Sequence, residues 1–184
     1  MNEGVIAARY AKALLKYVQE LKAGEDVYSQ ACSLMHKMQA VRQLADYVCR
    51  HPEIDMDRKT DLLEAALEEP LSDGLRRFVR LVYEHKRMEL FQRMLYSFIE
   101  QYRSFAGIMV GRLVSAANVP GLKERLETML MQRTGALVQI EEEVQPDLVG
   151  GFIVEIDGMR MDASVQEQIR RLRRELIDNN NRIV

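Results

Sequence analysis

The spacing of apolar residues divides the chain into two parts with different periods. Up to about residue 105, apolar positions recur at intervals of three and four, which is typical of amphipathic helices. From Ile108 the period falls to two, which predicts a strand. The change near Phe105–Gly107 predicts a boundary between a helical domain, residues 1–105, and an α/β domain, residues 106–184.

The first part is predicted to fold as a six-helix bundle. Its first helix has one apolar face within residues 6–21, and Gly24 ends that pattern. The dipeptide His51–Pro52 closes the third helix, because a residue before proline disfavours helical conformation. Ser72 is expected to cap the fifth helix. Helices with short connections over about 100 residues can build a core of their own.

The second part is predicted to be a small α/β domain built around a glycine pair. Its expected elements are a strand at 108–116, a helix from Pro120 to Gly135, strands at 137–144 and 152–156, a segment at 159–162, and a helix from Ser164. Gly150–Gly151 lies between two strands, and no lysine or helix follows it as a phosphate loop requires. A bend, a bulge or a close approach of two backbones is therefore expected there.

The last helix carries both an apolar stripe and a cluster of arginines. Ser164 and Glu167 fit a capping box at its start. The cluster could serve a regulatory nucleic-acid-binding protein, or it could receive an acidic helix of a partner protein. Four arginines within five positions cannot all face one partner, and no aromatic residues are interleaved with them. The stripe comprises Val165, Ile169, Leu172 and Leu176, and the arginines are Arg170, Arg171, Arg173 and Arg174.

Composition and charge exclude several classes of protein. The net charge is −2, with 16 basic and 16 acidic residues in 1–105 and 10 and 12 in 106–184, so neither domain has the basic balance that nucleic-acid-binding domains usually show. No apolar run approaches the ~20 residues of a membrane span, and the N-terminus has no signal-peptide pattern. With only two cysteines, Cys32 and Cys49, reduced thiols are expected rather than a disulfide framework.

Candidate chemistry is sparse. Two cysteines and two histidines could in principle hold a metal, but their spacing matches no common zinc motif; they are Cys32, His36, Cys49 and His51. No serine lies in a nucleophile elbow, and the three histidines have no partner pattern. Glu141 and Glu143 are expected on one solvated face of a strand. We therefore predict no catalytic residue, no metal and no cofactor.

Short motifs along nearly the whole chain resemble the delta subunit of the F-type ATP synthase, the family of the oligomycin-sensitivity-conferring protein. Their order and spacing carry the resemblance. Asp157–Gly158 and Ala163 depart from the family pattern at turn positions. The motifs are Ala8–Leu14, His51–Pro52 with Lys59, Leu62 and Leu63, His85–Lys86–Arg87, Val114–Ala116, and Pro146, Leu148, Gly150–Phe152, Asp162, Ser164 and Leu172.

The resemblance implies a non-catalytic stator subunit of the peripheral stalk. It implies that the N-terminal domain docks the N-terminus of an alpha subunit, and that the C-terminal domain binds the C-terminus of the b subunit. Rotation driven by ion flow is thereby coupled to ATP synthesis. No transit peptide precedes Met1, so we expect a bacterial protein on the cytoplasmic face of the plasma membrane, held there only through its partners.

Candidate partner-binding residues follow from the resemblance and from the apolar faces. In the family the groove for the alpha subunit lies between the first and fifth helices, which here present Tyr10, Ala13, Leu14, Tyr17, Leu75, Phe78, Val79 and Val82. Ala13 is small enough to let a partner approach closely. For the b subunit, the residues expected to bind are Ile169, Leu172, Arg173 and Leu176. The predicted structural motif of the second domain consists of Gly150, Gly151, Asp162 and Ser164.

Overall fold

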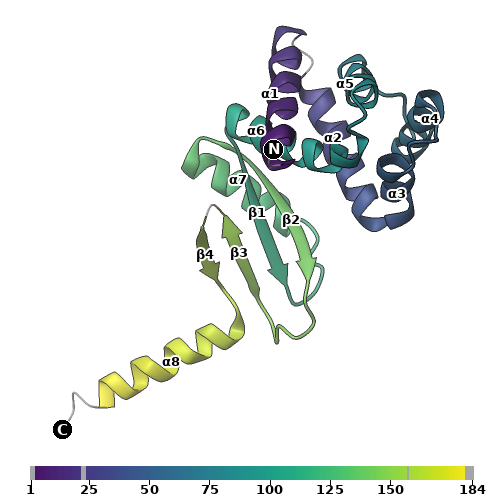
Figure 1. Cartoon of the computed structure of the whole chain (residues 1–184). Coiled ribbons are helices and arrows are strands. Elements are labelled where there is room, and N and C mark those ends of the chain that lie inside the picture. The colour runs from purple at the N-terminus through teal and green to yellow at the C-terminus, as the bar shows by residue number, and fades with distance from the viewer. Residues whose placement is uncertain (1–2, 22–23, 157, 181–184) are drawn as a thin grey trace. The chain divides into compact units, whose positions relative to one another are not determined.

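The computed structural model describes residues 3–21, 24–156 and 158–180, with residues 175–180 described by their backbone alone. The chain divides into two compact units, Met1–Phe105 and Ala106–Val184. The described part of the first unit contains only helices, and the second contains strands and helices (Figure 1). The division falls where the hydrophobic period changes from helical to strand-like.

The helices of the first unit follow one another through short connections. They are α1 (Glu3–Leu21), α2 (Gly24–Ala40), α3 (Arg42–Arg50), α4 (Met56–Leu67), α5 (Asp73–Glu84), the short 3₁₀ helix η1 (Met88–Leu90) and α6 (Phe91–Ala106). Leu90 belongs to η1, and α6 begins directly after it at Phe91.

The core of the first unit is aliphatic and aromatic. Its fully buried side chains include Val18, Val27, Leu34, Leu63, Phe91 and Phe98. The Gln30 side chain binds the turn before α5, because its Oε1 accepts from the Ser72 amide at 2.9 Å and its Nε2 donates to the Pro70 carbonyl at 3.0 Å. The Ser72 hydroxyl makes no capping hydrogen bond, so the predicted cap is wrong although α5 does begin after Ser72.

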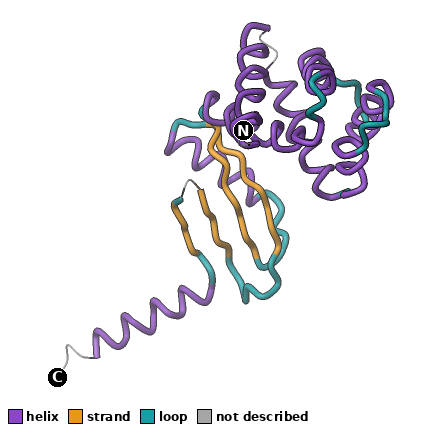
Figure 2. The backbone as a smooth tube through the Cα atoms, viewed as in Figure 1, coloured by secondary structure: helices purple, strands orange, loops and turns teal. Residues whose placement is uncertain are grey.

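The second unit has one four-stranded sheet. Its elements are β1 (Ile108–Ser115), α7 (Leu122–Thr134), β2 (Leu137–Val144), β3 (Phe152–Ile156), β4 (Met159–Asp162) and α8 (Val165–Asn180). The strand order is β2-β1-β3-β4, with β1 parallel to β2 and the other pairs antiparallel (Figure 1). Figure 2 shows the four strands side by side in orange. The parallel pair requires a crossover, which α7 provides. The chain is thus mostly helical with a small mixed sheet, consistent with the expected combination of a helical part and an α/β part.

α7 packs on one face of the sheet and closes a small core. The buried members of this core are Leu113, Leu126, Val138, Ile140, Val154 and Ile156. α7 begins at Leu122 after Gly121, so the expected start at Pro120 is wrong. On α7, Met131 packs on this core, whereas Met129 is 37% exposed. The predicted stop is confirmed, because Gly135 adopts φ 69° and donates to the Met131 carbonyl at 2.9 Å.

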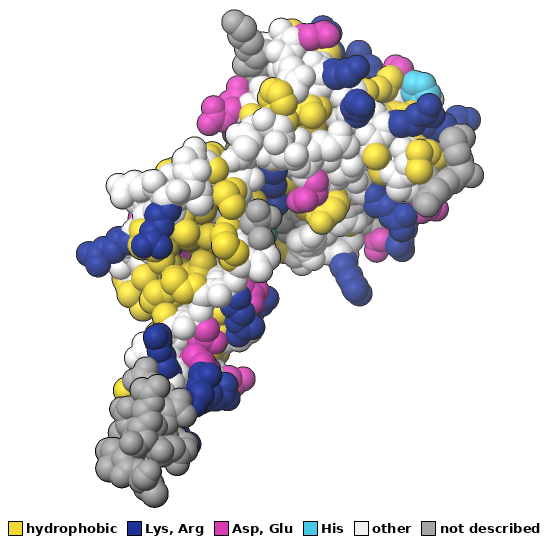
Figure 3. Space-filling view, turned by 90° about the vertical axis from the view of Figure 1, so that its left-hand side faces the viewer, with side chains coloured by type: hydrophobic (Ala, Val, Ile, Leu, Met, Phe, Trp, Pro, Cys, Tyr) yellow, Lys and Arg dark blue, Asp and Glu magenta, His cyan; other side chains and the backbone are white. Residues whose placement is uncertain are grey.

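Much apolar surface of the second unit stays exposed. Figure 3 shows hydrophobic side chains gathered over this unit, at the left of the view near mid-height. Among the large apolar residues of its strands, Met159 is the most exposed, at 66%. No helix in the described ranges combines the length and hydropathy that crossing a membrane requires.

Candidate functional site

A groove of about 260 Å³ lies between α1 and α5. Ala13, one of its lining residues, is exposed on α1, with Tyr10 three residues before it and Tyr17 four residues after it. These three positions share one face of α1 because the helical repeat is 3.6 residues. The lining consists of Ala13, Leu14, Tyr17, Gly74, Arg77, Phe78 and Leu81.

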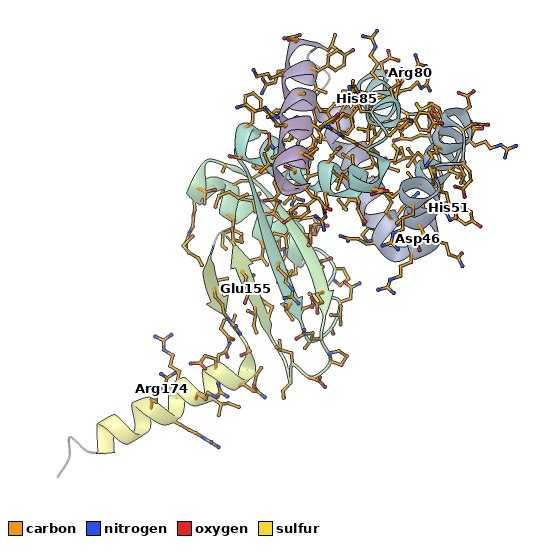
Figure 4. The ribbon with its side chains drawn as sticks, in the orientation of Figure 1. Asp46, His51, Arg80, His85, Glu155 and Arg174 are labelled. Atoms are coloured by element: carbon orange, nitrogen blue, oxygen red, sulfur yellow. The ribbon has the colours of Figure 1, made fainter. Side chains whose placement is uncertain are left out.

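Two tyrosine–arginine pairs lie at this face of α1. The Arg77 guanidinium stands over the Tyr17 ring, with Cζ 5.7 Å from the ring centroid. The Arg87 guanidinium stands over the Tyr10 ring, with Cζ 5.5 Å from the ring centroid. Its Nη1 donates to the Tyr10 hydroxyl at 3.1 Å. His85, labelled in Figure 4, lies at the end of α5 and packs edge-on against the Tyr10 ring, with the two ring centroids 6.2 Å apart. These contacts hold both tyrosine rings, each half-buried, in place.

The structure sorts the eight residues predicted to contact the alpha subunit into two groups. Ala13, Leu14, Tyr17 and Phe78 line the groove, and Tyr10 lies on the same face of α1. Leu75, Val79 and Val82 each have 0% exposure, so they form the core beneath the groove and are not on its surface.

Sequence reasoning missed three residues of the groove. Gly74, Arg77 and Leu81 line it, and Leu81 is 39% exposed. The spacing of three and four from Gly74 through Arg77 to Leu81 was available in the sequence as a signal. These three residues lie beside the predicted apolar stripe through Phe78, and Gly74 and Arg77 are not apolar.

The glycine pair lies against the start of α8. A Cβ built on Gly151, whose φ is +81°, would stand 2.3 Å from the Ala163 carbonyl oxygen and 2.9 Å from the Ser164 Cα. The Gly150 carbonyl accepts from the Val165 amide at 3.0 Å, and the Phe152 carbonyl accepts from the Ala163 amide at 2.9 Å. Two backbones thus meet where only glycine fits, which is one of the alternatives expected from the sequence.

Asp162 and Ser164 both accept hydrogen bonds from backbone amides at the start of α8. The Ser164 amide donates to Asp162 Oδ1 at 3.0 Å, and the Glu167 amide donates to Ser164 Oγ at 3.3 Å. Hydrogen bonds from Ser164 hold the pKa of the Asp162 carboxyl below its usual range. The capping box is confirmed in one direction only, because the Glu167 carboxylate pairs with Arg174 at 2.5 Å and with Arg170 at 3.5 Å.

α8 presents its apolar stripe to solvent. Val165 is 38% exposed, Ile169 46% and Leu172 58%. Arg173 is exposed beside the stripe. Leu176 belongs to the stretch whose side chains lie outside the described residues. An amphipathic helix with an uncovered apolar stripe is what a helix-binding surface requires.

The four candidate metal ligands do not form a site. In the described ranges, no three His, Cys, Asp or Glu side chains are grouped so that they could hold a metal ion. His51 Nδ1 instead lies 2.5 Å from Glu53 Oε1, and its ring stacks on Tyr47 at 5.1 Å. Cys49 is a free thiol whose pKa is raised by burial.

Lys59 is the most deeply buried charged side chain that the structure describes, with 1% exposure. Its ammonium donates to the Val48 carbonyl, near the end of α3, at 2.6 Å. Burial lowers the pKa of this ammonium. The position of a cation at the carbonyl end of a helix gives Lys59 a structural role in joining α4 to α3.

The two-unit fold has counterparts among known proteins. The family model "ATP synthase delta (OSCP) subunit" matches residues 6–176. A solved chain in the cryo-EM structure of the Toxoplasma gondii mitochondrial ATP synthase hexamer aligns with a TM-score of 0.63 and 19% identity, covering 93% of this chain and 97% of that one. At that identity the likeness concerns the fold.

Curated relatives cover the full length of the chain. A protein of Phocaeicola vulgatus named ATP synthase subunit delta is 36% identical over 186 residues, which is 100% of both chains. A protein of the same name from Bacteroides fragilis is 32% identical over 187 residues, and one from Desulfitobacterium hafniense is 30% identical over 179 residues, 96% of this chain and 98% of that one. The chain therefore belongs to the ATP synthase delta (OSCP) subunit family, the non-catalytic stator subunits of the ATP synthase.

Proposed function

We propose that this chain links the catalytic head of the ATP synthase to the C-terminus of the b subunit, with each of its units holding one partner. The first unit, acting as one six-helix bundle, docks the N-terminal segment of an alpha subunit, and the second unit grips the b subunit. The link keeps the head from turning with the rotor, so that ion-driven rotation is coupled to ATP synthesis. The protein works at the cytoplasmic face of a bacterial membrane, held there by its partners.

The observation that carries the proposal is the groove between α1 and α5. It has an apolar floor of Leu14 and Phe78, and exposed Ala13 leaves room for a close approach. Its partly exposed residues, Tyr17 and Leu81, supply apolar surface that a partner could bury. A groove between two helices with such a lining suits one face of an amphipathic helix.

The exposed stripe of α8 supports the second half of the proposal. Ile169 and Leu172 expose about half of their surface in the isolated chain, and their spacing of three matches one face of a helix. If the helical end of the b subunit packed along this stripe, it would remove both side chains from water. Apolar anchors of this kind supply most of the binding free energy of an interface.

Ion pairing within α8 counts against the nucleic-acid alternative. Arg170 and Arg174 both pair with Glu167. Their positive charge is therefore partly neutralised by Glu167, whereas binding to a phosphate backbone would require unpaired arginines.

A binding experiment with the full chain tests both contacts separately. A peptide from the N-terminus of the alpha subunit should bind the wild type and fail to bind Ala13→Asp, while Ala8→Asp, exposed elsewhere on α1, should bind normally. A fragment from the C-terminus of the b subunit should bind the wild type and Gln166→Asp but not Leu172→Asp. If Ala13→Asp remained folded and bound the alpha peptide as the wild type does, the groove would not be the docking site.

A further inference from the structure

We propose that the two tyrosine–arginine pairs beside the α1–α5 groove bind acidic side chains of the docked helix. These contacts fix the position of the helix along the groove. This inference rests on the proposed docking of a helix from the alpha subunit. It adds the charge pattern that the helix must carry. The occupant is an amphipathic helix with two carboxylates about two turns apart, flanking its apolar face.

The spacing of the two pairs comes from α1. Tyr10 and Tyr17 are seven residues apart, which is nearly two turns and about 10 Å along the helix axis. Arg87 stands over the first ring and Arg77 over the second. A helix lying along the groove would thus meet one cation near each tyrosine, with Ala13 between them.

Both cations are available to a partner. Among the described residues, neither Arg77 nor Arg87 has a carboxylate oxygen within 4.0 Å, unlike Arg76, whose Nη2 lies 2.7 Å from Glu64 Oε1. Stacking on a tyrosine ring fixes a guanidinium without using all of its five N–H donors. Each stacked arginine can therefore donate to a carboxylate that arrives from the partner.

The local charge balance favours an acidic partner. Residues 3–21 and 73–87 together hold eight Lys or Arg and four Asp or Glu, a net charge of +4 in a chain whose total is −2. The groove thus lies in a basic region of an acidic protein. Such complementarity steers association and sets the register of the docked helix.

A pair of synthetic helices tests the inference with the full chain. Both peptides carry the same apolar stripe; one has two glutamates seven positions apart beside the stripe, and the other has glutamines there. At 20 mM salt the glutamate peptide should bind about fivefold to tenfold more tightly, the effect expected of two partly exposed ion pairs. At 0.5 M salt the preference should vanish because exposed charges are screened.

Protein variants assign the preference to the two arginines. The double change Arg77→Gln and Arg87→Gln should remove the preference for glutamate while leaving the affinity for the glutamine peptide nearly unchanged. Arg76→Gln is the matched control, and it should keep the preference. Circular dichroism of each variant establishes that it is folded.

The outcomes separate this inference from the docking proposal. If Ala13→Asp abolished binding of both peptides while the wild type bound them equally, the charge pattern would be refuted and the groove would stand. If Arg76→Gln lost the preference for the glutamate peptide as fully as the double variant does, the inference would also be overturned. If wild-type protein bound neither peptide the inference would fail, and if it also ignored the natural N-terminal segment of the alpha subunit, the docking proposal would fail with it.

Discussion

Gly151 lies so close to Ala163 that a Cβ at Gly151 would stand 2.3 Å from the Ala163 carbonyl oxygen. The contact joins the loop before β3 to the residue that precedes Ser164 and α8. Because the obstacle is backbone, no side-chain rotation can relieve it. The glycine pair therefore anchors the start of α8 on the sheet.

We predict that Gly151→Ala destabilises the second unit by about 3 kcal/mol or more, from left-handed strain together with the backbone clash. Gly135→Ala is the matched control, since Gly135 has φ +69° but nothing within 4 Å of a built Cβ. It should cost only about 1 kcal/mol. Amide hydrogen exchange of β3 measures both changes, and equal losses in the two variants would contradict the close-approach account.

The carboxyl of Asp162 makes the cap of α8 sensitive to acid. Its pKa is depressed in the folded chain, so its stabilising contribution is present above the ordinary Asp value of about 3.9 and is lost as the pH falls through the folded value. Protection of the Ser164 amide should therefore decline in that acid range. Asp162→Asn should lose this pH dependence, whereas a wild-type titration with no decline would refute the role of the carboxylate.

Lys59 is predicted to stabilise the first unit through both its stem and its ammonium. Lys59→Ala removes a fully covered side chain and the donor to Val48, and should cost about 2–4 kcal/mol. Lys59→Met keeps most of the volume and should cost about 1 kcal/mol. All seven tyrosines lie in the first unit, so tyrosine fluorescence during urea unfolding reports on this unit alone.

The pH dependence of the same unit gives an independent check on Lys59. Burial lowers the pKa of its ammonium, so the cost of burying the charge is fully present below the folded pKa and is relieved as the pH rises toward the unfolded value of about 10.4. Stability of the first unit relative to Lys59→Met should therefore increase with pH in the alkaline range. A decrease would mean that the folded chain favours the charged form.

Some elements of the fold could be predicted from the sequence and others could not, for physical reasons. Helices and strands with clear periods were found because burial of one face imposes those periods, as in α1 and β1. The Ser72 hydroxyl makes no capping bond, and the turn before α5 is held instead by Gln30, 42 residues away, which accepts from the Ser72 amide. A local pattern carries no information about such a distant contact.

The same limit applied to the groove. Ala13 and Tyr17, which line the groove, were predicted because they lie four residues apart on one face of α1. Arg77 was missed because it is charged and lies beside the apolar stripe of α5, and its stacking over Tyr17, 60 residues earlier in the chain, does not show in the local spacing. Leu75, Val79 and Val82 were included because an apolar stripe does not distinguish a core residue from one on a groove's surface.

The most direct test of the linkage is retention of the catalytic head on membranes that lack their own delta subunit. Wild-type protein should restore sedimentation of the head with the membranes. Ala13→Asp should stay on the membranes without the head, and Leu172→Asp should stay with the released head. If either folded variant retained the head on the membranes as well as the wild type does, the proposal that the chain joins head and stalk through these two surfaces would be contradicted.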